Sequence, residues 1–244
     1  MDDVSQLITA IAALVSALFW PIVIVTVFVV FRKELRPSLK RLPDLLGRVR
    51  KVKIAGIEAE LDKVADAVPD ADNLGEEITR QEIQTASRVE TQARSLDDDA
   101  LWEQVHTLST EYESLRKAMP SGPTRTNAMT RVFVKMRTLG PSVVSFVDDL
   151  KRSRSAGERL FAIAIMQIEP DVADIDWLEK RFQGERPFVF FHAANALRVV
   201  AQAGDPARAS QARAVAERAL QKVRGFGAGP DRDTTRVLES IVAS

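Results

Sequence analysis

The residues best suited to chemistry lie in one stretch, ERPFVFFHAANAL, which covers residues 185–197. Glu185, His192 and Asn195 place a carboxylate, an imidazole and an amide here, and a carboxylate near an imidazole can serve general acid–base catalysis. A helix puts His192, Asn195 and Phe188 on one face. The alternative is a buried polar pair, His192 and Asn195, that hydrogen-bonds to a neighbouring loop. We favour the buried pair, because the helix is apolar nearly all round and no Ser–Asp arrangement completes a triad.

Three further patterns each lack part of the ligand site that they resemble. Residues 97–99 (DDD) open a helix, where acids usually act as caps and dipole partners rather than metal ligands. The acids between residues 169 and 176 lack the turn glycine and the final Glu of a calcium loop. Residues 225–229 (GFGAG) follow a helix, whereas a phosphate loop follows a strand. We therefore expect no metal, no cofactor and no enzymatic activity.

The composition favours an all-α protein. One Tyr and 11 Gly among 244 residues argue against a strand-rich fold, and the absence of Cys excludes disulfides, thiolate zinc sites and Cys nucleophiles. Apolar residues recur at helical spacing between punctuating Pro and Gly residues, and Ser155 with Glu158 forms a capping box. Residues 101–244 should therefore pack as antiparallel helix pairs in a helical-repeat-like domain. The expected helices cover residues 100–119, 124–139, 142–150, 158–168, 174–182, 187–203, 207–223 and 230–242.

Part of this domain follows a recognisable pattern. The pattern begins with Ser-x-Gly-Glu-Arg and continues through a Pro-Asp loop, Trp-Leu, Glu-x-Pro-Phe and a His-Ala-Ala-x-Ala-Leu helix. Residues 125–243 thereby resemble a helical C-terminal module of uncharacterised actinobacterial-type effector and signalling proteins. The resemblance implies an interaction module, in some cases attached to defence-type effector domains, with no catalytic residues to carry over. The matching positions are Gly157, Glu158, Arg159, Pro170, Asp171, Trp177, Leu178, Glu185, Pro187, Phe188, His192 and Leu197, and the expected module core is Trp177, Pro187, Phe188, His192 and Asn195.

The first hydrophobic stretch, residues 7–31, has 25 residues and no charge. As a helix it would span roughly 37 Å, more than the ~30 Å hydrocarbon core of a bilayer, so we expect a tilted or bent transmembrane helix in residues 1–36. A cleaved signal peptide would need a basic start and a shorter apolar core. Trp20 and Pro21 predict a kink near the centre. Thr9, Ala13 and Ala17 form a small-residue face suited to helix association.

The charges beside this stretch predict its orientation. Residues 32–53 hold nine Lys or Arg and two acids, whereas the residues before the stretch hold none of the basic type. The positive-inside bias places the N-terminus outside the bacterial inner membrane and the C-terminal domain in the cytoplasm. The cations nearest the span should contact anionic lipid headgroups. They are Arg32, Lys33, Arg36, Lys40 and Arg41.

Two segments connect the anchor to the helical domain. Residues 37–68 are basic and amphipathic and should assist assembly below the membrane; for residues 49–60 both a helix, which we favour, and a short strand pair fit the pattern. Residues 69–100 hold too few apolar residues to build a core and should form an acidic linker or a solvated helix. Residues 1–31, 32–57, 58–113 and 114–244 carry net charges of −2, +7, −12 and +7.

The sequence thus predicts a non-enzymatic single-pass membrane protein that forms a homo-oligomer and presents its helical domain to a cytosolic protein partner. A sharper version makes it a membrane-acting effector of a bacterial defence or stress system. Two alternatives remain. One is an enzyme with a site around His192, Asn195 and Glu185. The other is a nucleic-acid-binding protein that uses the basic C-terminal region, which we rank below a protein partner.

Overall fold

The structure is a computed structural model that describes residues 51–68, 77–226 and 231–244. The chain divides into two compact units, residues 1–52 and residues 53–244, and the second is the helical unit. In the described ranges no helix is both long enough and apolar enough to cross a bilayer. The predicted membrane helix, its kink, its association face and its headgroup contacts all fall outside the described residues. These positions are Thr9, Ala13, Ala17, Trp20, Pro21, Arg32, Lys33, Arg36, Lys40 and Arg41.

All regular structure in the described residues is helical, which confirms the all-α prediction. Most predicted helices begin within two residues of the observed ones; the expected helix 142–150 is instead a 3₁₀ segment followed by a short α-helix. The elements are α3 (Arg80–Ala93), α4 (Asp98–Ala118), α5 (Pro123–Leu139), η1 (Gly140–Phe146), α6 (Val147–Arg152), α7 (Ala156–Ile168), η2 (Pro170–Val172), α8 (Ile175–Gly184), α9 (Pro187–Gln202), α10 (Pro206–Arg224) and α11 (Arg232–Val242).

The helices begin where short polar side chains can accept a free backbone N–H group. Asp97 accepts the N–H of Ala100 at 2.8 Å, so the acidic run at residues 97–99 does open a helix as a cap. Ser155 accepts the N–H of Glu158 at 3.1 Å, which is half of the capping box predicted for α7; the Ser155 N–H donates to Ser153 Oγ at 3.0 Å and not to Glu158. The same role is played by Asp174 for α8, Asp205 for α10 and Asp231 for α11.

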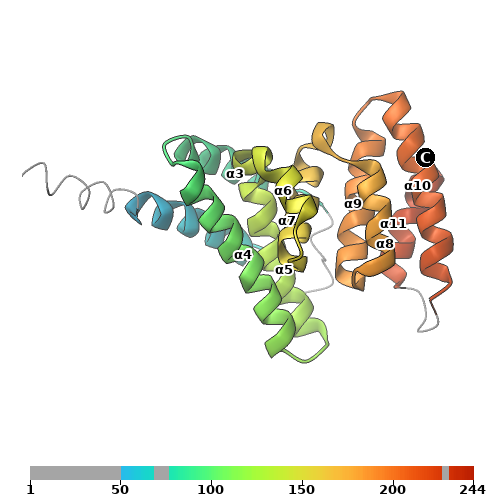
Figure 1. Cartoon of the computed structure of the whole chain (residues 1–244), viewed down its shortest axis with the longest axis horizontal. Coiled ribbons are helices and arrows are strands. Elements are labelled where there is room, and N and C mark those ends of the chain that lie inside the picture. Colours follow the sequence, from blue (N-terminus) through green and yellow to red (C-terminus); the bar gives the residue numbers. More distant parts are fainter. Residues whose placement is uncertain (1–50, 69–76, 227–230) are drawn as a thin grey trace, which may run out of the picture. The chain divides into compact units, whose positions relative to one another are not determined.

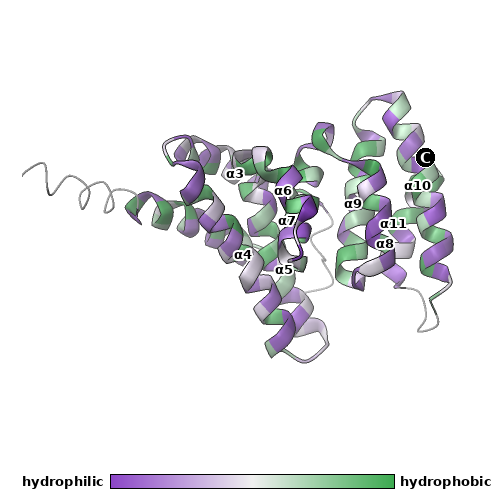
Figure 2. Cartoon of the chain, in the orientation of Figure 1, coloured by the Kyte–Doolittle hydropathy of each residue, from purple (hydrophilic) through white to green (hydrophobic). Residues whose placement is uncertain are grey.

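Helices α7 and α9 form the interior of the unit. Residues 160–167 of α7 and 189–197 of α9 are buried on every side, as their nearly continuous apolar sequences predict. Helices α4 and α5 pack against α7, while α8, α10 and α11 pack against α9, as Figure 1 shows. The outer helices, such as α4 and α10, carry both hydrophilic and hydrophobic residues along their length in Figure 2, as amphipathic helices do.

Two segments near the start of the unit bear on the structures predicted for residues 49–60 and 69–100. Residues 51–66 are helical, so the helix and not the strand pair is adopted over the part of 49–60 that is described. Within 69–100, α3 is not a solvated helix, because Val89 is fully buried and belongs to the core with Ala93. The low apolar content misleads here, since α3 contributes a buried ion pair as well as apolar contacts.

That ion pair joins α3 to α5. The Arg137 guanidinium, whose side chain is 1% exposed, contacts both carboxylate oxygens of Glu82, and the Nη2–Oε2 distance is 2.7 Å. Arg137 Nη1 also donates to the Gln167 Oε1 atom of α7 at 3.0 Å. Gln167 Nε2 in turn donates to the carbonyl of His192 in α9 at 2.7 Å. A single polar network therefore connects α3, α5, α7 and α9 through the middle of the core.

Candidate functional site

A cation-rich cleft lies on the surface where the end of α4, the start of α7 and the end of α8 meet. Two hollows of about 460 and 500 Å³ share Arg154, Arg159, Gly184 and Glu185, so they form one continuous cleft. Eight basic side chains line it and only two acidic ones do. The basic residues are Arg116, Lys117, Lys151, Arg154, Arg159, Lys180, Arg181 and Arg186, and the acidic residues are Glu113 and Glu185.

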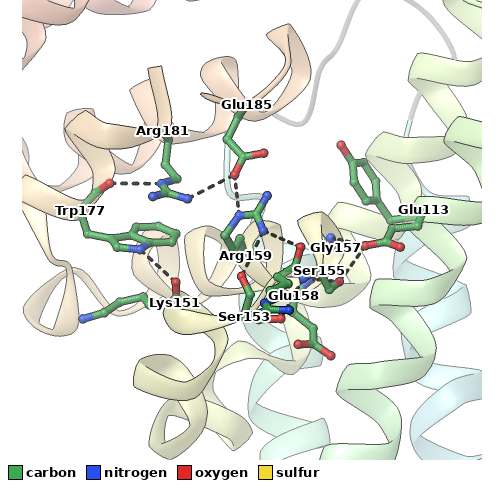
Figure 3. A network of polar contacts seen from close by, with 12 residues as sticks. Glu113, Lys151, Ser153, Ser155, Gly157, Glu158, Arg159, Trp177, Arg181 and Glu185 are labelled. Carbon is green, nitrogen blue, oxygen red and sulfur yellow. Dashed lines mark hydrogen bonds and ion pairs between the residues drawn. The ribbon is translucent and has the colours of Figure 1, made fainter. Parts of the chain in front are cut away.

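The centre of the cleft is one carboxylate held between two guanidinium groups. Glu185 Oε1 accepts from Arg159 Nε at 2.6 Å and from Arg181 Nη1 at 3.2 Å, as Figure 3 shows. Arg181 also stacks over the Trp177 ring, with its Cζ 4.2 Å from the ring centroid. The Trp177 Nε1 atom donates to the carbonyl of Lys151 at 3.2 Å, which joins α8 to the end of α6. These contacts hold Arg159 and Arg181 in place.

One wall of the cleft is formed where Glu113 of α4 caps the N-terminus of α7. The Ser155 hydroxyl donates to Glu113 Oε1 at 2.7 Å, and the Gly157 N–H donates to the same atom at 3.1 Å (Figure 3). The hydrogen bond from Ser155 is the main reason that the pKa of Glu113 lies below its ordinary value. Glu113 is therefore an anchoring carboxylate in this structure, and a poor proton donor.

Gly157 allows α4 and α7 to approach this closely. A Cβ atom at this position would lie 2.2 Å from the backbone oxygen of Ser109, closer than any real contact. The short distance between the two helices thus explains the glycine of the Ser-x-Gly-Glu-Arg pattern, and the two residues that follow it have different roles. Glu158 pairs at 3.4 Å with His106, whereas Arg159 lines the cleft and bonds to Glu185.

Four outer cations of the cleft are not held in ion pairs, although Lys117 lies within electrostatic reach of Glu113 and Lys180 within reach of Asp174. Lys117, Arg154, Lys180 and Arg186 are exposed, and none of them forms an ion pair with any residue in the described part of the chain. The surrounding unit is not basic, because residues 53–244 hold 26 basic and 30 acidic side chains. Positive potential is therefore concentrated at the cleft rather than spread over the unit.

The predicted module core divides between the cleft and the interior. Trp177 packs behind the cleft against Arg181 and Lys151, and Pro187 is the first residue of α9. The Phe188 ring stacks on Tyr112 with 5.8 Å between centroids and meets the His192 ring edge-on at 4.5 Å. Phe188 thus links the rim of the cleft to the buried His192.

His192 and Asn195 are buried, but not as the predicted pair bonded to a loop. Both His192 ring nitrogens lack a hydrogen-bond partner among the residues that the structure describes, and the ring stacks on Phe133 at 3.6 Å. Asn195 Nδ2 donates to the carbonyl of Phe191 in its own helix, at 3.1 Å. Burial, with a smaller contribution from Arg137, lowers the pKa of His192 well below its ordinary value, so the imidazole is neutral. Glu185 meanwhile bonds to Arg159 and Arg181, so the structure does not bring Glu185 and His192 together as a catalytic pair.

Comparison of the chain with models of known families, with curated proteins and with solved structures finds no match. Sequence reasoning missed Glu113, Arg154 and Arg186 as members of one site, because α4, the α6–α7 loop and the start of α9 are brought together only by folding. The available signals were the glycine of the capping-box segment and the local excess of Arg and Lys.

Replacing Gly157 with Ala should destabilise the protein by about 1–3 kcal/mol, because the added methyl group forces α4 and α7 apart. Chemical unfolding of the full-length protein in detergent, followed by circular dichroism, measures this change. Gly184 provides the matched control, since a Cβ there meets nothing within 4 Å. Equal stability of the Gly157→Ala and Gly184→Ala variants would contradict the close crossing.

Replacing His192 with Leu should make stability less dependent on pH below about 6.5, the ordinary pKa of histidine. The unfolded chain binds a proton at His192 as the pH falls below this value, whereas the folded chain resists protonation because its pKa is lowered. The parent protein therefore loses up to about 1.4 kcal/mol per pH unit through this group, down to the lowered pKa. Unfolding midpoints measured between pH 5 and pH 8 test the difference.

Asn195→Leu is the matched control for that measurement, because Asn195 is a buried polar neighbour that does not titrate. It should alter the overall stability without altering the pH dependence of the parent protein. Identical pH profiles for the parent protein and His192→Leu would show that His192 is not held neutral in the core.

Proposed function

We propose that this protein is a non-enzymatic membrane-anchored adaptor whose helical unit binds a protein partner at the cation-rich cleft. The observation that carries the proposal is a contact network at a fixed surface cleft: Arg159 bonds to Glu185, and Trp177 supports the cleft through Arg181, while the outer cations form no ion pair in the described chain. Arg159, Trp177 and Glu185 were all singled out by the sequence pattern. Exposed polar groups that are held on a rigid frame are typical of recognition surfaces.

The anchor of the proposed adaptor is the chargeless stretch at residues 7–31, with the cations of residues 32–53 on its cytoplasmic side. Self-association through the Thr9, Ala13 and Ala17 face would bring several helical units together at one patch of membrane. The resemblance to effector modules makes a bacterial defence or stress system the proposed setting. In such a setting, partner binding would cluster the membrane helices.

Two observations favour protein binding over the alternative functions. His192 has no exposed surface, and its stacking on Phe133 leaves it apart from the cleft, so it is poorly placed for catalysis. For nucleic acid, the unit as a whole is acidic, whereas nucleic-acid-binding domains are usually strongly basic. Trp177, which packs beside the cleft, has one ring face covered by Arg181, so that face is not open for base stacking.

Photo-crosslinking in living bacteria tests the proposal. A photoreactive amino acid at Lys180, inside the cleft, should give an adduct of discrete mass with a second protein in the membrane fraction. The same amino acid at Ala214, an exposed position on α10, is the matched control and should give none. Recovery of the full-length protein in the soluble fraction, or the same adducts at both positions, would contradict the proposal.

A further inference from the structure

The basic side chains that line the cleft indicate which kind of partner segment it binds. We infer that it binds an acidic segment of the partner protein, an extended stretch whose Asp and Glu carboxylates pair with Arg154, Arg186 and Lys117. This inference rests on the proposed function, and it adds the class of partner and the residues that select it.

The backbone positions of Arg154 and Arg186 are fixed although their side chains are exposed. Arg159 Nη1 donates to the carbonyls of Ser153 at 3.1 Å and of Arg154 at 2.8 Å, which holds the loop before α7. Arg186 is the N-cap residue of α9, and its carbonyl accepts the N–H groups of Val189 and Phe190 in the first turn of that helix. Each cation therefore loses only side-chain freedom on binding, which lowers the entropic cost of recognition.

Two carboxylates of the protein itself are already bound in the cleft. Glu185 accepts from Arg159 and Arg181 together, and Glu113 accepts from a hydroxyl and a backbone N–H at the start of α7. Both internal carboxylates are thus compensated by donors of the fold. The planar guanidinium groups of Arg154 and Arg186 have no such partner in the described chain, and this group matches a carboxylate in geometry as well as charge.

The distribution of charge favours a segment with several carboxylates over a single small anion. One hollow is lined by Lys117 and Arg186, the other by Lys180, and Arg154 lies where the two hollows join. The cations thus follow a path along the cleft instead of converging on one point. An extended acidic peptide can occupy both hollows at once, and each added carboxylate strengthens binding and accelerates encounter.

Fluorescence anisotropy with the full-length protein in detergent tests the inference. The probe is a labelled 12-residue peptide of alternating Glu and Gly, and the matched probe replaces each Glu with Gln. We expect binding of the Glu peptide only, weakened at least about tenfold between 50 and 500 mM salt, because exposed ion pairs are screened. Binding of the Gln peptide with similar affinity would overturn the inference.

Charge-reversal variants test whether Arg154 and Arg186 bind the peptide. The double variant Arg154→Glu, Arg186→Glu should lose at least about tenfold in affinity for the Glu peptide, because it removes two cations from the cleft and adds two carboxylates. Lys222→Glu with Arg232→Glu changes the net charge equally at exposed positions outside the cleft, so it should retain the parent affinity. Circular dichroism verifies that both double variants remain folded. Equal losses in the two double variants would overturn the inference.

Other occupants are separated by competition. Inorganic phosphate, vesicles that contain phosphatidylglycerol, and a single-stranded oligonucleotide should displace the Glu peptide less well than an unlabelled Glu peptide at equal charge. If any of them displaces the labelled peptide better, that competitor and not an acidic segment is the ligand of the cleft. If the crosslink at Lys180 forms in cells but persists unchanged in the Arg154→Glu, Arg186→Glu variant, the proposed function stands and this inference fails.

Discussion

The ion pair between Arg137 and Glu82 is the interaction on which the interior of the helical unit depends. Both side chains are buried, and removing a charged group from water costs on the order of several kcal/mol. Each charge is therefore stable in the core only while the other remains its partner. The pair fixes α3 against α5 at one position. Gln167 then extends the fixed arrangement to α7 and, through the His192 carbonyl, to α9.

Helices α7 and α9 also contribute to the cleft, at their N-terminal ends. Helix α7 begins beside Arg154 and supplies Arg159, and α9 begins at Pro187, directly after Arg186. Because Gln167, near the C-terminal end of α7, bonds to α9 and both helices pack in an apolar core, their N-terminal ends have little freedom to move apart. The Glu113 cap on α7 and the Arg159–Glu185 contact complete the frame. Polar interactions inside the unit thus fix the positions of charged residues on its surface.

The sequence was sufficient for the helices and insufficient for the contacts between them. Local signals such as Ser155 before Glu158, or Pro187 at the start of an apolar run, identify helix starts because caps act within one turn. The burial of α3 could not be predicted from its apolar content, since Glu82 becomes a core residue only when Arg137 lies opposite. The cleft was missed for a related reason: Glu113 and Ser155 are 42 residues apart, and no periodic pattern records their meeting. His192 was correctly expected inside, but its aromatic surroundings come from Phe133 on another helix.

Hydrogen–deuterium exchange of the full-length protein, with and without the Glu peptide, tests most directly whether the cleft is a preformed site for acidic segments. A preformed site predicts slower exchange over residues 153–159 and 185–190 when the peptide is bound, and unchanged exchange in α10 and α11. Protection that is absent, or that appears mainly in α10 and α11, would contradict it.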